Sequence, residues 1–422
     1  MRLYIDPGTG SMLFTILIGL ISSLVFFGRK LLLKASFVLH GGKAQKAGKE
    51  DRVPIAIFSD HKRYWNVFEP VCDELEKRGA SAEYLTASPD DPALEKEYTH
   101  IQTRFIGEGN AAFAKLNMMR ADVILSTTPG LDVYQWKRSK YGGYYVHVLH
   151  AANDPVAYRM FGLDYYDALL LSGAYQTAQI RALETKRHLP EKEIVLAGLP
   201  HMDAMAARLQ KAGPESHDGV NVLLAPSWGI NGIFSVYGAS VIEALLQCGH
   251  HVILRPHPQS LQSEKEMIED LRTRFPDSEK LEWNFDNDNF EVLRRSDILI
   301  SDFSGVIFEF AFVFDKPVIY ADTSFDKGPL DAWWLEEDLW TFSALPRLGH
   351  ALQKEDLPRI GEVISHCLTD EGFANARAAL RDETWVHRGE AAVRVAEYLI
   401  EKQRTLTAQN DMPDELPAPQ AS

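Results

Sequence analysis

Two polar motifs in the C-terminal half combine residue types that suit phosphate chemistry. In the first, RPHP at 255–258, Arg255 could neutralise phosphate oxygens, and His257 could give a proton or hydrogen bond to a leaving group. The two prolines stiffen the loop and limit the movement of the imidazole. The tetrapeptide by itself fits a structural turn equally well. Only its neighbours in the fold can show whether it is a functional site or a turn.

The second motif, SDFSG at 301–305, lies between an apolar run and an apolar helical stretch. Ser304 and Gly305 would open this helix, whose free backbone N–H groups and dipole favour a bound phosphate. Ser301 and Asp302 complete this candidate site for the phosphates of a donor. An ordinary helix cap by Ser304 or Asp302 is the competing interpretation. The two interpretations are compatible.

A third candidate, His150, ends a predicted strand in the N-terminal half. It could act as a general base on an incoming hydroxyl, and Asp154 could hold its tautomer. A purely structural histidine is the alternative. Other segments that follow predicted strands could border the same cleft. Their candidate residues are Pro200, Asp203, Ser227 and Trp228.

From Val53 onward, short β-branched runs alternate with helical stretches, which is typical of parallel sheets built from βαβ units. The polar stretch 211–219 (KAGPESHDG) separates two such alternations and is the best candidate for a linker. Strands are predicted at 54–58, 82–85, 122–126, 144–149, 168–172 and 194–197, then at 220–225, 251–254, 297–301 and 317–320.

This organisation predicts an α/β, GT-B-like fold of two facing Rossmann-like domains, with ligands bound beyond the carboxyl ends of the strands. The acceptor-side domain would span 51–213 and the donor-nucleotide domain 214–403. The Pro-rich, polar end at 404–422 is predicted to be a disordered tail.

Residues 1–50 are predicted to form a membrane-associating segment. The run at 11–27 contains no charge and is followed by a basic stretch, which would keep the body of the protein at the cytoplasmic face of the cell membrane. A buried core helix and a secretory signal peptide are the alternatives. A spanning and an interfacial anchor both remain open.

Composition and missing motifs exclude several classes of protein. The 44 basic and 59 acidic residues give a formal charge of −15, which argues against a nucleic-acid-binding protein. The chain has no dinucleotide fingerprint, Walker lysine motif, HExxH or GxSxG. The acidic run at 286–289 (DNDN) is better explained as a solvated turn than as a metal site. The sequence therefore indicates no certain cofactor and no metal ligands, and the need for a divalent metal stays open.

The candidate motifs occur in an order that resembles the CDP-glycerol glycerophosphotransferases, the family of teichoic acid primases and polymerases. This order is His150, GLPHMD at 198–203, APSW at 225–228, RPHP at 255–258 and SDFSGVIFEF at 301–310. The resemblance implies a membrane-associated GT-B enzyme in which an acceptor hydroxyl attacks the β-phosphorus of CDP-glycerol and CMP leaves. It also implies that His150 is the base, that His257 assists the donor phosphate or leaving group, and that Asp302 and Ser304 contact the donor phosphates.

The chain departs from the family pattern mainly after His150. It reads HAANDP at 150–155, where the family usually has His-Gly-Thr-Pro. The expected partners are CDP-glycerol or a related CDP-alditol, a polyprenyl-linked or polymer acceptor, and membrane lipid. The acceptor and the alditol stay open. Two alternatives remain: a GT-B glycosyltransferase with a nucleotide-sugar donor, and an inactive membrane-bound assembly factor of the same fold.

Overall fold

The two predicted alternations of strand and helix form two parallel β-sheets. The computed structural model describes residues 52–411 apart from 214, 216, 287 and 322. The predicted membrane segment therefore lies outside the described residues. Within the part that is described, no helix combines the length and apolar character needed to cross a membrane.

The first sheet has seven strands in the order β3-β2-β1-β4-β5-β6-β7, and every neighbouring pair is parallel. Its central strands β1 and β4 are almost wholly buried, as their apolar sequences VPIAIFS and ADVILS predict. The strands are β1 (Val53–Ser59), β2 (Ala82–Thr86), β3 (Ile101–Phe105), β4 (Ala121–Ser126), β5 (Tyr144–Val148), β6 (Ala168–Leu171) and β7 (Glu193–Leu196).

The second sheet has six parallel strands in the order β10-β9-β8-β11-β12-β13. Both sheets thus reverse their strand order once, between β1 and β4 and between β8 and β11. Ligands of open parallel sheets bind beyond the carboxyl ends of the strands at such switch points. The strands are β8 (Asn221–Leu224), β9 (His251–Leu254), β10 (Leu281–Trp283), β11 (Ile298–Ser301), β12 (Val318–Ala321) and β13 (Gly349–Leu352).

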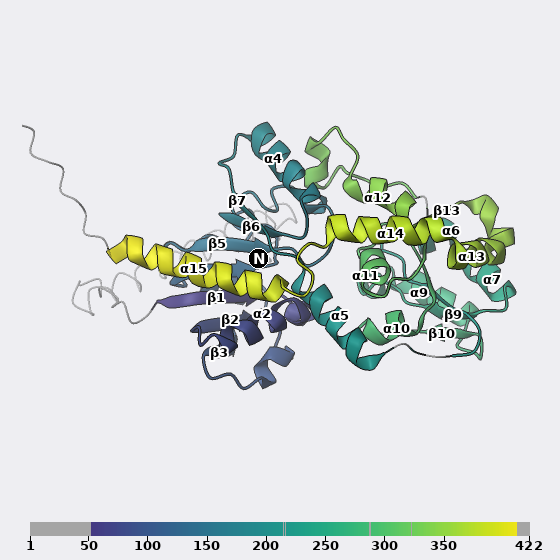
Figure 1. Ribbon diagram of the computed structural model, residues 1–422, viewed down its shortest axis with the longest axis horizontal. Coiled ribbons are helices and arrows are strands. Elements are labelled where there is room, and N and C mark those ends of the chain that lie inside the picture. Colours follow the sequence, from purple (N-terminus) through teal and green to yellow (C-terminus); the bar gives the residue numbers. More distant parts are fainter. Residues whose placement is uncertain (1–51, 214, 216, 287, 322, 412–422) are drawn as a thin grey trace, which may run out of the picture. The chain divides into compact units, whose positions relative to one another are not determined.

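Helices connect the strands and cover the sheets (Figure 1). The α-helices are α2 (Trp65–Lys77), α3 (Asn110–Leu116), α4 (Tyr175–Arg187), α5 (Pro200–Ala212), α6 (Ile233–Tyr237), α7 (Ala239–Gln247), α8 (Ser260–Ser263), α9 (Lys265–Arg274), α10 (Phe290–Arg295), α11 (Val306–Val313), α12 (Trp340–Leu348), α13 (Ile360–Thr369), α14 (Glu371–Thr384) and α15 (Ala391–Asp411). The short 3₁₀ helices are η2 (Lys62–Tyr64), η3 (Pro92–Glu95), η4 (Pro155–Ala157), η5 (Asp331–Trp334) and η6 (Lys354–Arg359).

Alternate residues of each strand enter different hydrophobic clusters. In β1, Ile55 and Ile57 pack into one cluster, whereas Ala56 and Phe58 pack into another. The cluster that contains Ala56 and Phe58 continues into the other sheet through Leu223 of β8 and through residues of α5 and α11. Since successive strand residues point to opposite faces, one continuous apolar layer connects a face of each sheet. This layer makes the two halves parts of one packed unit.

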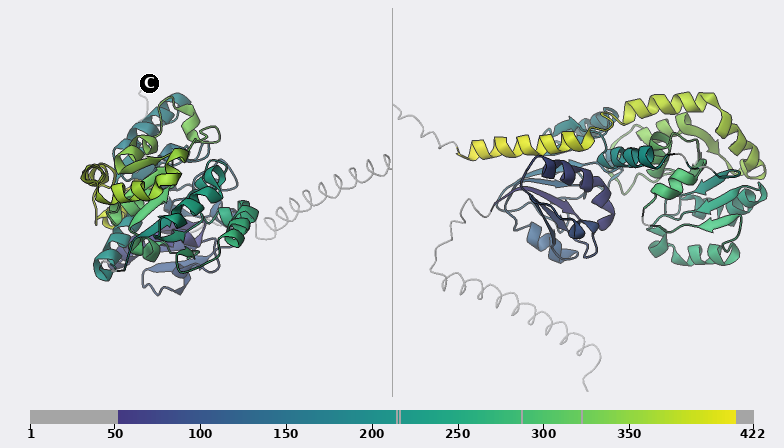
Figure 2. Two further views of the ribbon diagram at one scale, coloured as in Figure 1. Left: turned by 90° about the vertical axis from the view of Figure 1, so that its right-hand side faces the viewer. Right: turned by 60° about the horizontal axis from the view of Figure 1, so that its bottom comes forward.

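The last helix, α15, returns to the first half of the chain. It packs against α2, β1 and β4, whereas α14 packs against α11 and α12 of the second half (Figures 1 and 2). The predicted tail at 404–422 begins inside α15, and residues 412–422 lie outside the described part. The domain limits of 51–213 and 214–403 stay a prediction.

Candidate active site

A pocket of about 360 Å³ gathers residues from the carboxyl ends of strands in both sheets. The second half contributes Arg255, His257, Ser304 and Gly305, and the first half contributes His150. The structure therefore brings together five residues that the sequence placed in three separate motifs. A volume above 300 Å³ is in the range of ordinary small-molecule sites.

Ser301 and Asp302 lie beneath this pocket and do not line it. Ser301 Oγ donates a hydrogen bond to the Ala225 carbonyl (2.6 Å), which connects the ends of β11 and β8. The buried Asp302 carboxylate accepts N–H bonds from Ser227 (2.9 and 3.1 Å) and Ile233 (3.2 Å). Burial raises the pKa of Asp302, and these bonds oppose that shift. Both residues hold the switch-point loops in place, so their direct contact with donor phosphates stays a prediction.

Arg255 and His257 follow β9 directly, as predicted. The Arg255 guanidinium contacts the Asn284 side chain and donates from Nη2 to the Asp286 carbonyl (2.7 Å). These bonds fix the guanidinium at the pocket without neutralising its charge by an ion pair among the described residues. Fixed positive charge at this edge favours a phosphate group.

The His257 ring is held in one orientation. Its Nδ1 accepts the backbone N–H of Gln259 (3.1 Å), so the neutral ring must carry its proton on Nε2. Burial, followed by the positive charge of Arg63, lowers the pKa of His257 to about 4. At neutral pH, His257 is therefore a hydrogen-bond donor to the pocket and is not a cation.

His150 is also neutral and is enclosed by aromatic rings. Its Nδ1 lies 2.9 Å from Thr127 Oγ1, and the ring centroids of Tyr64 and Tyr158 lie 5.0 and 6.3 Å away. Burial, followed by the nearby His201 and Arg63, lowers the pKa of His150 to about 4. When Nδ1–H donates to Thr127, the lone pair of Nε2 is left to accept a proton.

Asp154 does not hold the His150 tautomer. Its buried carboxylate accepts the backbone N–H groups of Trp340 (2.8 Å) and Thr341 (3.0 Å), together with the Thr341 hydroxyl. These are free donors at the start of α12, which an acidic side chain satisfies well. Asp154 thus connects the segment after β5 to the second half of the molecule. The residue that contacts His150 is Thr127, in the place where Asp154 was predicted.

The remaining predicted cleft residues lie away from the pocket lining. Asp203 accepts hydrogen bonds from Trp385 Nε1 and the Ala391 N–H (both 2.9 Å), which tie α5 to the C-terminal helices. Pro200 is the buried first residue of α5. Ser227 has a buried hydroxyl without a partner among the described residues, and Trp228 is 46% exposed. Their direct part in ligand binding stays a prediction.

Two groups of pocket residues were missed by the sequence analysis. Arg63 and Tyr64 follow β1 at the first switch point, and Arg63 makes no ion pair among the described residues while its guanidinium lies 4.8 Å from the Tyr64 ring centroid. The sequence did contain a signal for this group, because Arg63 and Tyr64 are a basic and an aromatic residue that stand next to each other just after a central strand. Arg63 matters because its charge lowers the pKa of both His150 and His257.

The second missed group is the buried chain of His201, Glu309 and Asn289. His201 Nε2 donates to Glu309 Oε1 (3.1 Å), and Asn289 Nδ2 donates to Glu309 Oε2 (2.7 Å). Although burial alone would raise the pKa of Glu309, these bonds hold it below its ordinary value. Glu309 is the one carboxylate among the lining residues, against the guanidinium groups of Arg63 and Arg255. The pocket is therefore suited to an anion such as a diphosphate.

Comparison with known proteins shows which family the sequence resembles. Residues 157–327 match the model of the CDP-glycerol:poly(glycerophosphate) glycerophosphotransferases. Over these residues the chain is similar to the glycerophosphotransferase family. The resemblance drawn from the sequence motifs is thereby confirmed, as is the class of enzyme. The matched stretch contains His257, Asp302 and Ser304, whereas His150 lies before it. No curated protein matches the chain in sequence.

Solved structures of family members and of other enzymes share the fold. The wall teichoic acid polymerase TagF is 14% identical, with a TM-score of 0.59 over 92% of this chain and 99% of its own. A putative UDP-N-acetylglucosamine 2-epimerase from Listeria monocytogenes is 15% identical, with a TM-score of 0.52 over 82% of this chain and 94% of its own. At these identities the likeness shows the fold, and it confirms a GT-B-like α/β architecture.

Proposed function

We propose that this chain transfers glycerol phosphate, or a related phosphoalditol, from a CDP-linked donor to a membrane-linked glycan or polymer, with release of CMP. The observation that carries the proposal is the pairing of two buried, neutral histidines, one after a strand of each sheet, in a pocket that also contains Arg255 and the start of α11. A variant of TagF has been studied after soaking with CDPG, which supports the donor class.

The reaction is an in-line exchange of oxygens at the β-phosphorus. The acceptor hydroxyl forms the new P–O bond, its proton passes to Nε2 of His150, and the bond from the β-phosphorus to the bridging oxygen breaks. That oxygen leaves with CMP. The Nε2–H of His257 and the guanidinium of Arg255 stabilise the negative charge that develops on the donor.

The donor phosphates would lie at the start of α11. Ser304 and Gly305 line the pocket, and the helix from Val306 to Val313 has no side-chain cap on its first N–H groups. The helix dipole favours an anion at this position, although the N–H groups of Ile307 and Phe308 already donate to the Ser304 and Gly305 carbonyls (both 3.1 Å). Asp302 supports the proposal indirectly, since it fixes the loops on which this turn rests.

A nucleotide-sugar glycosyltransferase is the second candidate, because the epimerase-like structures share the GT-B-like fold. Incubation of the purified full chain with CDP-glycerol, CDP-ribitol and nucleotide-sugars, followed by identification of the released nucleotide, separates the two. We expect CMP from a CDP-alditol. Release of a nucleoside diphosphate from a nucleotide-sugar would favour the glycosyltransferase, and turnover of none of the donors would favour an inactive assembly factor.

We further propose that the segment at 1–50 anchors the enzyme at the cytoplasmic face of the membrane. The support is the uncharged run at 11–27 and the basic residues that follow it. Deletion of residues 1–34 is expected to release the protein into the soluble fraction. Continued membrane binding of the truncated protein would show that another surface is responsible.

A further inference from the structure

One wall around His150 is formed by Tyr158, which begins a tight turn at residues 158–162. The Tyr158 ring centroid lies 6.3 Å from that of His150, and the Tyr158 hydroxyl lies 3.3 Å from Nε2 of the buried His147 on β5. Because the imidazole of His150 packs against Tyr158, a shift of this turn would change both the position and the exposure of the proposed base.

The backbone of this turn is strained. Phe161 has a φ of +66°, which a bulky residue rarely adopts. A Cβ on Gly162 would lie 2.8 Å from the Tyr158 Cβ, so only glycine allows the chain to fold back this closely. Strained backbone of this kind persists only where the surrounding structure holds it in place. The turn therefore needs support from outside its own residues.

The support comes from Asp331, a fully buried residue of η5 in the second half. Its carboxylate accepts the N–H groups of Phe161 (2.7 Å) and Gly162 (3.1 Å). Its own N–H donates to the Tyr158 carbonyl (2.8 Å). Both ends of the turn are thus bonded to one residue that lies 170 positions after Phe161 in the sequence.

A buried ion pair holds the Asp331 carboxylate in this position. Arg187 of α4 donates from Nη1 to Asp331 (2.6 Å) and from Nη2 to Asp164, and its side chain is only 6% exposed. Its guanidinium also lies 5.5 Å from the Phe161 ring centroid and 5.8 Å from that of Trp334. Removal of one partner from such a buried pair is strongly destabilising. The pair therefore joins α4, the turn and η5 in one arrangement.

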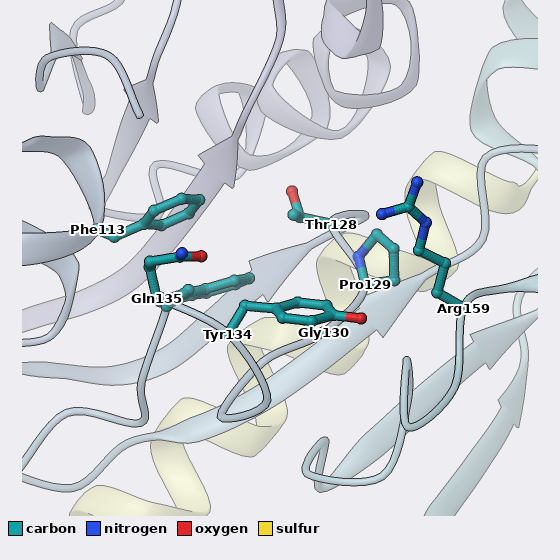
Figure 3. Close-up of a pocket in the computed structure, with 8 residues that line it drawn as sticks. Phe113, Thr128, Pro129, Gly130, Tyr134, Gln135 and Arg159 are labelled. Carbon is teal, nitrogen blue, oxygen red and sulfur yellow. The ribbon is translucent and has the colours of Figure 1, made fainter. Parts of the chain in front are cut away.

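The stretch 330–341 of the second half makes two further contacts with the segment after His150. The backbone of Leu330 forms an antiparallel bridge with Arg159, whose side chain lines the neighbouring pocket in Figure 3. Asp154 accepts N–H groups at the start of α12, which belong to the same stretch. We call residues 330–341 the strap. The strap holds both ends of the segment that follows the proposed base.

We propose that the strap positions His150 for proton transfer and that Asp331 is the positioning residue on which this depends. The described residues that line the donor pocket include none from the strap, so Asp331 acts through the turn and Tyr158 and not on a ligand. Because the strap belongs to the second half, it ties the base of one half to the half that contains Arg255 and His257. The role of His150 as base rests on the proposed function, whereas the strap rests on the contacts above.

The first measurement follows the strap itself and needs no turnover. In the full-length Asp331→Ala protein, the amide hydrogens of residues 155–164 should exchange with solvent faster than in the parent, because two N–H groups lose their acceptor. Asp356→Ala is the matched control. Asp356 is also a buried aspartate, and it accepts the Gln353 N–H (3.0 Å) in η6. Its loss should leave exchange at 155–164 unchanged. Parent-like exchange of this segment in Asp331→Ala would overturn the inference.

The second measurement is of transfer kinetics, under conditions where all the proteins are folded. In Asp331→Ala, kcat should fall by about tenfold or more, while KM for CDP-glycerol stays within about twofold. The acid limb of the rate profile should move up by about one pH unit toward 6.5, since exposure removes the burial that lowers the pKa of His150. Asp331→Asn keeps an acceptor oxygen and should retain more of kcat, and it takes the place of Asp331→Ala if that protein does not fold. Asp356→Ala should keep the kcat and the acid limb of the parent.

The direction of the pH shift separates exposure from a direct charge effect. Loss of the negative charge of Asp331 would by itself lower the pKa of His150, whereas exposure raises it. The titratable groups that surround His150 are the same in the parent and in both Asp331 variants. These groups are Arg63 and Tyr64 after β1, His147 of β5, Tyr158 of the turn, His201 of α5 and Glu309 of α11.

The two measurements together distinguish this inference from the proposed function. Parent-like kcat and acid limb in both Asp331 variants, despite faster exchange, would overturn the positioning role. A rise in KM for CDP-glycerol that matches the loss of kcat would also overturn it, because the strap would then support the donor side. Faster exchange in Asp331→Ala, together with no release of CMP by the parent, would support the strap and overturn the proposed function instead.

Discussion

The two switch points of the molecule differ in how their acidic side chains are held. Between β8 and β11, Ser301 and Asp302 are buried and satisfied by the backbone of the adjacent loops. Between β1 and β4, Asp60 and Thr128 carry buried oxygens that reach no partner among the described residues. The backbone hydrogen bonds of Asp302 thus fix the loops of the second switch point, although the buried Ser227 hydroxyl there also has no partner among the described residues.

The largest expected effects come from the histidines, one on each side of this comparison. His150→Ala and His257→Ala should each lower transfer by a factor of about 100 or more, since each removes a proton-handling group. Only His257→Ala should also weaken CDP-glycerol binding. His250→Ala is the matched control, because His250 lies at the amino end of β9, opposite His257. Parent-like transfer by both histidine variants would refute the mechanism.

Asp302→Ala tests whether the donor side depends on its buried support. The change leaves the N–H groups of Ser227 and Ile233 without an acceptor, at about 1–3 kcal/mol for each buried group. We expect the free energy of unfolding in urea to fall by about 3 kcal/mol. Asp302→Asn keeps one acceptor oxygen and should lose less. Equal stability of the parent and Asp302→Ala would show that these bonds do not hold the loops.

The pH dependence of transfer reports the burial of both histidines. Their pKa values of about 4 keep both rings neutral at neutral pH, and protonation of His150 on acidification removes the base. The rate should therefore be level between about pH 6 and 8 and fall only as pH approaches 4. A half-maximal rate near the ordinary histidine pKa of about 6.5 would contradict this account.

Arg63→Gln should have a smaller effect on both sides at once. Loss of a positive charge that lowers the pKa of His150 and His257 should move the acid limb of the rate profile to higher pH. Donor affinity should fall by about tenfold through the lost charge. Arg63→Lys keeps the positive charge, so the pH at which its rate falls on the acid side should be close to that of the parent. An unmoved limb in Arg63→Gln would mean that burial alone sets these pKa values.

Trp228→Ala should have the smallest effect. The indole is 46% exposed and does not line the donor pocket, so kcat and KM for CDP-glycerol should stay within about twofold of the parent values. Steady-state kinetics checks this expectation. A large rise in KM would show that the APSW segment reaches the donor directly, as the sequence motif suggested.

Much of the fold could be predicted from local patterns. The run HVIL gave β9 with its observed limits, because it is short, apolar and followed by prolines. The edge strand β3 was missed, since IQTRF is half exposed and has no continuous apolar run. The strand β13 (GHAL) was missed as well, because its glycine and histidine are weak strand formers. The return of α15 to the first sheet depends on packing that no local pattern encodes.

The site was predictable where its residues share a motif and follow a strand directly. Arg255 and His257 are examples, as the carboxyl end of a parallel strand is a place where ligands bind. The contact of His201 with Glu309 joins residues 108 positions apart, so no spacing rule could find it. Similarly, Asp154 bonds to α12 at a distance of 186 residues in sequence. Contacts between residues so far apart in sequence depend on how the two halves pack against each other.

The most direct test of the central claim follows the phosphorus atom itself. CDP-glycerol labelled in the phosphate next to glycerol is incubated with the full-length protein and a poly(glycerophosphate) acceptor, and polymer and nucleotide are separated. Attack at the β-phosphorus predicts that the label enters the polymer and that the nucleotide is unlabelled CMP. Label retained in CDP would mean that the bond to carbon breaks instead, and would contradict the account.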